Sequence, residues 1–310
     1  MPPAPTPATL RPRMNDRALR YFLAVIRAGS IRGAAEALNL AASAVSRQVA
    51  ELEAECGVAL LERLPRGIRP TEAGRIVTAH ALRQAEDSAL LAESLQRLRG
   101  MRQGRVRLHC GDGFLPDLME NGLAAFAEAH PGLSFQVALG TTDAILAALA
   151  EGEAELGLAY NPPAHPALRS LALSRQPLAA ILPAAHPLAG DPRPLRDFAS
   201  LPAALLPPDH GVRRLLGRVE ADGGFRLPPR LESASFEMHR RFVLAGLGVA
   251  FLPRFAAARE ITDGTLVAVP LADPILAEAS AHLLARASGR LPEAAERMAD
   301  WLIAHLRALR

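Results

Sequence analysis

Apolar residues recur at helical spacing in three successive stripes near the amino terminus. The stripes are Leu19, Phe22, Leu23 and Ile26, then Ile31, Ala34, Ala35 and Leu38, then Val45, Val49, Leu52 and Cys56. Steps of three and four residues place each set on one helix face, so three short helices are expected. Gly29-Ser30 and Asn39-Leu40 separate them, and Ser30 is suited to cap the second helix. The pattern predicts a helix-turn-helix within a three-helix unit.

The third predicted helix, about Ser43–Glu55, carries short polar side chains opposite its apolar face. With the apolar face turned inward, its outer surface presents Ser43, Ser46, Arg47 and Ala50. Such a face is slim enough to enter the major groove of DNA, and its side chains can bond phosphates and base edges. We interpret this segment as a recognition helix.

A basic hairpin is expected after this helix. Leu60–Arg63 and Ile68–Thr71 can pair as a two-stranded wing that turns at Pro65-Arg66-Gly67 and is suited to the DNA backbone or an adjacent minor groove. The arginines expected to line the wing are Arg63, Arg66 and Arg69. The alternative is a solvated helical bundle with a basic loop. The complete order of helix, helix-turn-helix and wing within about 60 residues favours DNA binding over that alternative.

The charge distribution points to the same end of the chain. Residues 1–75 hold eleven Arg and seven Asp or Glu, a net charge of +4, whereas residues 76–310 hold 24 and 25, a net charge of −1. The chain contains no lysine, so the position of an arginine carries information but its choice over lysine does not. A basic amino-terminal quarter is typical of a nucleic-acid-binding domain.

Other features of the sequence indicate the cellular compartment. The first thirteen residues, MPPAPTPATLRPR, lack the apolar core of a signal peptide, so residues 1–14 are expected to be a disordered tail and Met14 an alternative start. No apolar run reaches the roughly 18 residues that span a bilayer. The two cysteines, Cys56 and Cys110, indicate a reducing compartment and no disulfide framework. We expect a cytoplasmic protein with no membrane partner.

A long helix is expected after the wing. From Thr71 to about Arg99 the sequence has no proline and one glycine, Gly74, with leucines and isoleucine among charged residues. A helix of roughly 40 Å is too long to fold back on so small a head domain, so pairing with a second copy is predicted. A solitary charged helix that bridges domains is the alternative. Residues 15–72 would form the head domain and 73–104 the linker, with a hinge over Arg99–Arg105.

From Arg105 onward, strands and helices alternate. Strands are expected in 105–111, 133–140 and 154–160, with helices over Phe114–His130 and Thr142–Glu151, which is the order of a parallel βαβαβ run. Later strands are expected in 178–183, 203–207 and 248–253, with helices near Gly211–Ala221, Phe236–Ala245 and Leu291–Leu309. The prediction is a two-lobed α/β domain, with one lobe over about 105–180 and 266–310 and the other over about 181–265. Crossing strands are expected near Leu178–Leu182 and Leu266–Val269.

A ligand site is expected between these lobes. Ligands of open α/β sheets bind beyond the carboxyl ends of strands, near helix N termini. The side chains expected there are Asp112, Phe114, Thr141, Thr142, His210, Ser233, Ser235 and Phe236. The alternative for each Ser or Thr is that it only caps its own helix.

The sequence offers no catalytic pattern. It contains no nucleophile elbow, no Gly-rich phosphate loop and no Cys/His metal spacing, so no catalytic residue, metal or cofactor is expected. A solute-binding protein with an amino-terminal protein-interaction domain is the alternative to a DNA-binding regulator.

Residues 15–75 resemble the DNA-binding domain of LysR-type transcriptional regulators. The resemblance rests on Phe22, Gly29-Ser30, Ala34-Ala35, Val45-Ser46-Arg47-Gln48, Leu52-Glu53, Leu61-Glu62-Arg63 and Thr71-Glu72-Ala73-Gly74. The candidate DNA-binding residues are Ser30, Ala42, Ser43, Ser46, Arg47, Gln48, Arg63, Arg66 and Arg69. Where the family often has Gln at the start of the recognition helix this chain has Ala42, which offers only a methyl group, so its operator preference is expected to differ.

The remaining chain resembles the effector domain of the same family, which is similar to periplasmic binding proteins. The matching phrases are FAEAHPGLSFQV, ALAEGEAELGLAY, AAHPLA and VLAGLGVAFLP. The resemblance implies double-stranded operator DNA and a small-molecule effector as partners. It also implies a homodimer through the long helix, a dimer-of-dimers tetramer and contact with RNA polymerase.

The turn after the first strand of this domain departs from the family. The family often has Ser or Thr there, whereas this chain reads Gly111-Asp112-Gly113. The carboxylate of Asp112 favours a hydroxylated, amine-bearing or neutral effector. Arg213 and Arg214 favour an acidic effector instead, so both classes of effector remain open at this point.

Overall fold

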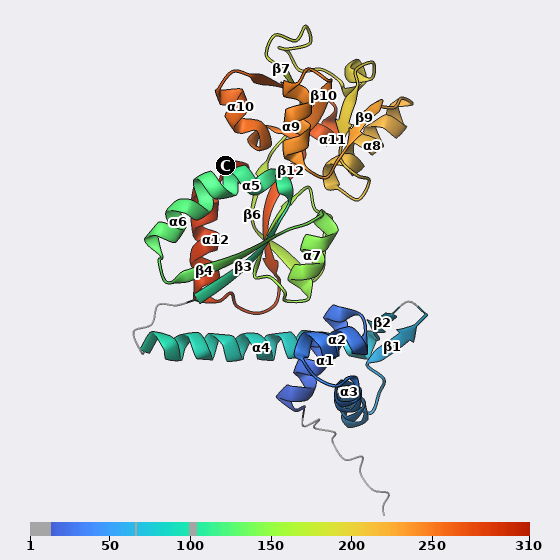
Figure 1. Ribbon diagram of the computed structural model, residues 1–310, viewed down its shortest axis with the longest axis vertical. Coiled ribbons are helices and arrows are strands. Elements are labelled where there is room, and N and C mark those ends of the chain that lie inside the picture. The colour runs from blue at the N-terminus through green and yellow to red at the C-terminus, as the bar shows by residue number, and fades with distance from the viewer. Residues whose placement is uncertain (1–13, 66, 99–103) are drawn as a thin grey trace, which may run out of the picture. The chain divides into compact units, whose positions relative to one another are not determined.

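The computed structural model describes residues 14–65, 67–98 and 104–310 (Figure 1). The chain divides into two compact units, Met1–Leu91 and Ala92–Arg310. The predicted tail and most of the predicted hinge fall outside the described residues, and so does Arg66.

The first unit is a three-helix head with a wing. Its helices are α1 (Asp16–Ala28), α2 (Ile31–Leu38) and α3 (Ala42–Cys56), followed by strands β1 (Leu61–Leu64) and β2 (Gly67–Pro70) and helix α4 (Glu72–Leu98). Ser30 caps α2 by accepting a hydrogen bond from the Gly33 N–H at 3.0 Å. Gly29 and Asn39 end the first two helices in the left-handed conformation, as helix C-termini favour. β1 and β2 pair antiparallel, as predicted for the wing.

The core of the head lies on both sides of α1. Tyr21 and Val25 pack with the buried residues of α2 and with Val45 and Val49 of α3. Phe22 and its neighbours pack instead with Leu52, Leu60, Val77, Ala81 and Leu82. The first turns of α4 therefore belong to the head core, a role that its length alone did not predict.

The second unit begins with a five-stranded sheet in the order β4-β3-β5-β12-β6. Its strands are β3 (Gly104–Cys110), β4 (Leu133–Leu139), β5 (Leu156–Tyr160), β6 (Leu168–Arg175) and β12 (Ser280–Arg286). β3 runs parallel to β4 and β5, as the predicted βαβαβ order requires, and β12 runs antiparallel to β5 and β6. Alternate residues of β3 pack with Phe126 and Met298 on one face, while α7 (Thr142–Ala150) covers the other face (Figure 1).

The helical stretch after β3 is less regular than the single helix expected. It comprises a 3₁₀ turn, Asp112–Phe114, then α5 (Leu115–Asp117), a π-helical turn, Leu118–Leu123, and α6 (Ala124–Ala129). Trp301 donates its indole N–H to the Gly122 carbonyl at 2.9 Å. A carbonyl within the π turn thus has a partner from α12 (Glu293–His305), which packs on the same lobe. The last predicted helix ends at His305, and a 3₁₀ turn, Arg307–Leu309, follows it.

The second sheet has the order β11-β7-β10-β8-β9. Its strands are β7 (Leu178–Pro183), β8 (Ala203–Leu205), β9 (Pro229–Glu232), β10 (Val249–Pro253) and β11 (Leu266–Pro270). The helices of this lobe are α8 (Gly211–Gly223), α9 (Phe236–Leu244), α10 (Ala258–Thr262) and α11 (Pro274–Ala277), with 3₁₀ turns at Leu195–Phe198 and Arg254–Ala257.

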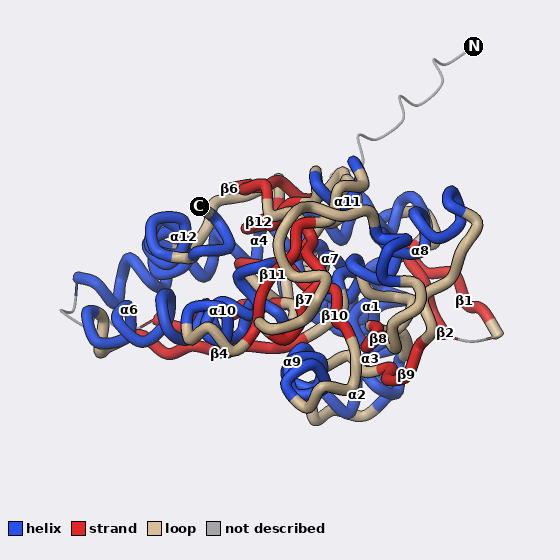
Figure 2. The backbone as a smooth tube through the Cα atoms, turned by 90° about the horizontal axis from the view of Figure 1, so that it is seen from above, coloured by secondary structure: helices blue, strands red, loops and turns tan. Residues whose placement is uncertain are grey.

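Strand pairing places the crossing points elsewhere than expected. β7 pairs with β11 from Ala179 to Pro183, and the two strands lie side by side in Figure 2. The expected boundary at residue 180 falls inside β7, and the expected return to the first lobe at 266 falls at the start of β11. The chain instead crosses between β6 and β7 and again between β11 and β12, because whole strands are kept within one hydrogen-bonded ladder.

Candidate DNA-binding and effector sites

The outer face of α3 carries the predicted DNA-reading residues. Ala42, Ser43 and Arg47 are exposed, and Ser46 and Gln48 are half-buried. Val45, on the opposite face, is completely buried, so packing against α1 and α2 fixes which side of α3 faces outward. The face is narrow and polar, as major-groove entry requires.

Glu51 is a member of this face that the sequence analysis missed. The Arg47 Nε lies 3.8 Å from the Glu51 carboxylate, and the Gln48 amide also donates a hydrogen bond to it. The Arg47 and Glu51 side chains are 74% and 54% exposed, so solvent screens the pair and a phosphate can compete for the guanidinium. The sequence did indicate this pair, because Arg47 and Glu51 are an oppositely charged pair four residues apart.

The N terminus of α3 has no side-chain cap. Ala41 stands at the N-cap position, where Ser, Thr, Asp or Asn is usual, and it provides no acceptor. Backbone N–H groups at an uncapped helix start are suited to a DNA phosphate. Ser30, also a candidate for DNA binding, uses its hydroxyl oxygen to cap α2, as predicted from its place before that helix.

One backbone hydrogen bond and one carboxylate hold the wing against the head. The Ile68 N–H donates to the Gly29 carbonyl at 2.8 Å, which ties β2 to the loop between α1 and α2. Glu53 of α3 accepts from the Leu60 and Leu61 N–H groups at 2.7 and 3.1 Å. These contacts set the position of the wing relative to α3.

The described wing arginines lie on opposite faces of the ribbon. Glu62 pairs with Arg69, and Arg63 pairs with Ile68. Directly paired residues share a face and consecutive residues alternate, so Arg63 and Arg69 stand on different faces of the wing. Both side chains are exposed.

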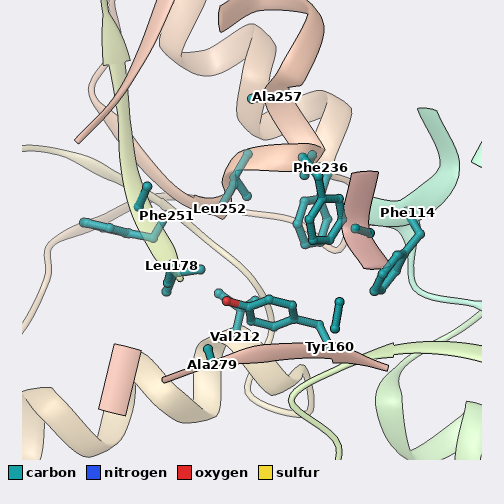
Figure 3. Close-up of a cluster of buried hydrophobic side chains, with 14 of the residues drawn as sticks. Phe114, Tyr160, Leu178, Val212, Phe236, Phe251, Leu252, Ala257 and Ala279 are labelled. Atoms are coloured by element: carbon teal, nitrogen blue, oxygen red, sulfur yellow. The ribbon is translucent and has the colours of Figure 1, made fainter. Parts of the chain in front are cut away.

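A small cavity lies between the two lobes of the second unit. Its volume is about 30 Å³. The lining residues are Gly111, Asp112, Gly113, Phe114, Gly140, Thr142, Ile145 and Tyr160 from the first lobe, and Leu206, His210, Gly211, Val212, Phe236, Pro253 and Phe255 from the second. The rings of Phe114, Tyr160 and Phe236 lie around this point, where the apolar core continues from one lobe into the other (Figure 3).

Five of the eight predicted effector residues line this cavity: Asp112, Phe114, Thr142, His210 and Phe236. The other three serve helix starts and turns, as the capping alternative held. Thr141 accepts from the Ala144 N–H at 3.3 Å, Ser235 from the Met238 N–H at 3.4 Å, and Ser233 from the Ser235 N–H at 3.2 Å.

Tyr160 and Phe255 line the cavity but were not predicted. Tyr160 is the last residue of β5, and Phe255 comes two residues after the end of β10. Both follow the rule that placed the other candidates, because both stand at the carboxyl ends of strands. The Tyr160 hydroxyl donates to the Gln176 carbonyl at 2.7 Å, and its burial raises the pKa of the phenol.

The cleft is closed by direct contact between the lobes. A β carbon at Gly113 would lie 2.8 Å from the Phe236 ring, and one at Gly211 would lie 2.8 Å from the Tyr160 carbonyl oxygen. Ligand sites usually have volumes of a few hundred Å³. A cavity of about 30 Å³ therefore has to widen before it holds more than a water-sized molecule.

The two arginines that argued for an acidic effector are engaged elsewhere. Arg213 pairs with the buried Glu220 at 2.6 Å, and Arg214 makes two hydrogen bonds to Asp143 at 3.0 and 3.2 Å. Burial lowers the pKa of His210, with Arg214 acting in the same direction against Asp209 and Asp112. Of the described residues that line the cavity, none is an arginine and Asp112 is the one carboxylate.

A larger cavity, of about 390 Å³, opens between α5 and the helices α9 and α10. Several of its charged side chains pair with one another: Arg240 with Glu237 and Glu260, and Arg241 with Glu237. None of the predicted effector residues lines it. The smaller cavity is the one that gathers the predicted effector residues.

Two further properties bear on the chemistry. Within the described parts of the chain no helix is long and apolar enough to cross a membrane, and no group of His, Cys, Asp or Glu is placed to hold a metal ion. Cys110 is completely buried, and burial, with Asp112 nearby, raises the pKa of its thiol to about 12. A thiol of this kind is unreactive at neutral pH.

Comparison with known proteins agrees with the geometry. Residues 17–75 match the family model for a bacterial regulatory helix-turn-helix protein of the lysR family, and residues 99–307 match the LysR substrate binding domain. The regulator CbbR of Rhizobium meliloti is 34% identical over 263 residues, which cover 83% of this chain and 82% of CbbR.

Solved structures share the fold. A full-length OxyR variant from Pseudomonas aeruginosa matches with a TM-score of 0.71 at 22% identity, over 96% of this chain and 98% of that one. Full-length CbnR in complex with its target DNA matches with a TM-score of 0.51 at 23% identity, over 94% and 99%. The match of the head to a regulatory DNA-binding family disfavours the solute-binding alternative. The chain belongs to the LysR family and is a ligand-responsive, DNA-binding transcriptional regulator of LysR type.

Proposed function

We propose that α3 reads operator DNA in the major groove and that the wing holds the neighbouring backbone. The observation that carries this proposal is the exposed face of Ala42, Ser43 and Arg47 on a helix whose opposite side is buried. Arg47 is the side chain on that face able to reach a base edge with two donors, while Ser43 and the uncapped N–H groups suit phosphates. Arg63 and Arg69 approach the backbone from the two faces of the wing. CbnR, which shares the fold, binds its target DNA in the solved complex, which supports this docking.

The effector is proposed to bind between the lobes, at the cavity around Phe114, Tyr160 and Phe236. A ligand that binds one lobe arrangement better than another shifts the population toward it. In a regulator the shift changes the spacing of paired head domains, and with it the bend of the DNA or the contact with RNA polymerase.

We further propose that the chain acts as a homodimer and as a dimer of dimers. Along α4, Leu91 and Leu95 are 61% and 51% exposed and lie one turn apart. Large apolar side chains on one side of a long helix favour a second helix as partner. Two head domains held by one symmetric pairing would bind half-sites about one DNA turn, or a multiple of it, apart.

The proposed location is the cytoplasm, where the chain meets DNA, and no catalytic step is assigned to it. The relatives that match it are transcriptional regulators. No side chain of the small cavity is arranged as a nucleophile with a base, and its one histidine has its pKa lowered by burial.

The proposal is tested by binding of the full-length protein to the DNA upstream of its own gene and to a scrambled fragment of equal length, over a series of salt concentrations. Preference for the upstream fragment is expected at every concentration. The logarithm of the affinity should fall linearly with the logarithm of salt, by about 0.9 per phosphate contact. Equal, salt-independent binding of both fragments would contradict a DNA-reading role for the head.

A further inference from the structure

The Asp112 carboxylate of the first lobe accepts a hydrogen bond from a backbone N–H group at the start of a helix in the second lobe. Its Oδ2 accepts from the Phe236 N–H at 2.6 Å. Phe236 is the first residue of α9, which has nine residues. A helix N terminus carries partial positive charge and free N–H donors, so the start of α9 is a place in this cleft where a bound anion would be stabilised. The chain's own carboxylate already occupies it.

The neighbouring contacts hold Asp112 in this position. Gly113 packs so closely under the Phe236 ring that a β carbon would not fit. Ser235 accepts from the Met238 N–H, so a second donor of the first turn of α9 is also used. The carboxylate and the packing together join β3 of the first lobe to α9 of the second.

The surroundings of Asp112 offer no cation for a further anion. Arg213 and Arg214 are paired with Glu220 and Asp143. His210 lines the cavity, and His239 lies beneath it with its Nε2 2.9 Å from the Ser233 carbonyl oxygen. Burial lowers the pKa of both imidazoles, so both are neutral at pH 7. An incoming anion would meet Asp112 without a compensating charge, which costs free energy in a desolvated site.

We propose that Asp112 is a tethered anion that closes the two lobes at the N terminus of α9 and excludes anionic effectors. The effector is then a non-anionic molecule that binds by donating hydrogen bonds to the Asp112 carboxylate. The inference rests on the proposed function of this cavity as the effector site and adds the chemical class of the ligand.

The test uses two small probes of equal shape and opposite charge, acetate and acetamidinium. The full-length protein is labelled with ¹⁵N-phenylalanine, which gives ten backbone signals, one per phenylalanine. The Phe236 signal is assigned from its loss in Phe236→Leu. Each probe is titrated into wild type, Asp112→Ala and the control Asp222→Ala, and Asp112→Ser is measured alongside as a second substitution that keeps a small polar side chain.

The wild-type Phe236 signal should respond to acetamidinium and not to acetate. In both Asp112 variants the preference should reverse, with acetate bound about tenfold or more tightly than in wild type, because the N–H regains a charged acceptor. Asp222→Ala should behave as wild type, because it removes an exposed carboxylate near the C-terminal end of α8 and leaves Arg213 and Arg214 paired.

The proposal is overturned if acetate shifts the wild-type signal as strongly as it shifts the Asp112 variants, or if no variant shows a preference for either probe. These readings need no DNA. Failure of the DNA experiment with intact probe selectivity would contradict the regulatory role, whereas the reverse result would contradict only the role of Asp112.

Discussion

Gly74, in the first turn of α4, lies very close to Leu60, the residue directly before strand β1 of the wing. A β carbon at Gly74 would lie 2.0 Å from the Leu60 carbonyl oxygen. Thr71, one turn earlier, caps α4 by accepting from the Gly74 N–H at 3.0 Å and donates to the Ala59 carbonyl at 2.8 Å. Together with Glu53, these residues position the wing rather than contact DNA. They explain in physical terms why Leu52-Glu53 and Thr71-Glu72-Ala73-Gly74 mark this domain.

Gly74→Ala should therefore destabilise the head by about 2 kcal/mol or more, because backbone must move to admit the methyl group. Gly57→Ala is the matched control: no atom lies within 4 Å of its β carbon, and its cost is left-handed strain of about 1 kcal/mol. Chemical denaturation of the two variants gives the comparison. Equal stability losses would contradict the proposed close approach.

His239 is a deeply buried histidine near the cavity between the lobes, with 1% of its surface exposed. Its ring stacks on Phe236 with centroids 6.2 Å apart, and its Nδ1 has no hydrogen-bond partner. Burial lowers its pKa in the folded protein. Protonation is consequently linked to unfolding of the second lobe.

Because the folded pKa of His239 lies below the unfolded value of about 6.5, the unfolded state binds the proton first as pH falls. The free energy of unfolding should decrease from pH 7 toward pH 5, by up to about 1.4 kcal/mol per pH unit for each such histidine. His239→Gln should flatten this slope in urea denaturation of the full chain. An unchanged slope would show that His239 does not couple to folding.

The positions of candidate residues were more predictable than their roles. The strand-end rule located Asp112, Phe114, Thr142, His210 and Phe236, because parallel strands bring their carboxyl ends to one edge. It could not separate ligand-facing hydroxyls from caps, since Thr141, Ser233 and Ser235 follow the same local pattern. The bond between Asp112 and α9 joins residues 124 positions apart, which local sequence cannot reveal.

At the scale of elements, α3 combines an uncapped start with an internal acid on its DNA-facing side. Glu51 draws Arg47 and Gln48 toward itself. An exposed i, i+4 pair of this kind contributes only about 0.3–0.5 kcal/mol to the helix, so its larger effect is on the electrostatics of the face.

Glu51→Gln should raise the affinity for both operator and scrambled DNA severalfold at low salt, because it removes a negative charge beside Arg47. Glu36→Gln is the matched control, since Glu36 forms the same i, i+4 pair with Arg32 on α2. Fluorescence anisotropy on the two fragments measures both. Weaker binding by Glu51→Gln would mean that Glu51 itself accepts a hydrogen bond from a base.

The helices α1, α2, α3 and α4 were predicted closely, because apolar residues recur at helical spacing along each of them. The strands β6, β9 and β12 were not predicted. β9 is four residues that begin with proline, and β6 and β12 mix Ala, Ser, His and Arg with leucines, so neither clear alternation nor a continuous apolar run marks them. Their assignment depends on partners distant in sequence, such as β12 between β5 and β6.

At the scale of the whole effector unit, the lobes meet at glycines as well as at charges. Gly211 starts α8 directly against Tyr160 and Thr142 of the first lobe, with its β-carbon position 2.8 Å from the Tyr160 carbonyl oxygen and 3.2 Å from the Thr142 hydroxyl. The closed cleft thus depends on the absence of a side chain at this point.

Gly211→Ala should wedge the lobes apart and increase hydrogen exchange at the Phe236 amide, which would lose its bond to Asp112. Gly217→Ala lies in the same helix and meets its nearest atoms only at 3.4 Å and beyond. That control should leave exchange unchanged and stabilise α8 by about 0.5–1 kcal/mol. Hydrogen-exchange mass spectrometry of the full chain distinguishes the two, and equal protection in both variants would contradict closure through Gly211.

The central claim is that the outward face of α3 reads DNA, and Arg47→Ala tests it most directly. Measured at one salt concentration on the upstream fragment, this variant should bind about tenfold or more weakly than wild type and should lose most of its preference over scrambled DNA. Arg32→Ala, which removes from α2 another exposed arginine that pairs with a glutamate four residues on, should bind like wild type. If Arg47→Ala kept wild-type affinity and preference, or if Arg32→Ala lost as much, the DNA-reading surface would not be the face of α3 described above.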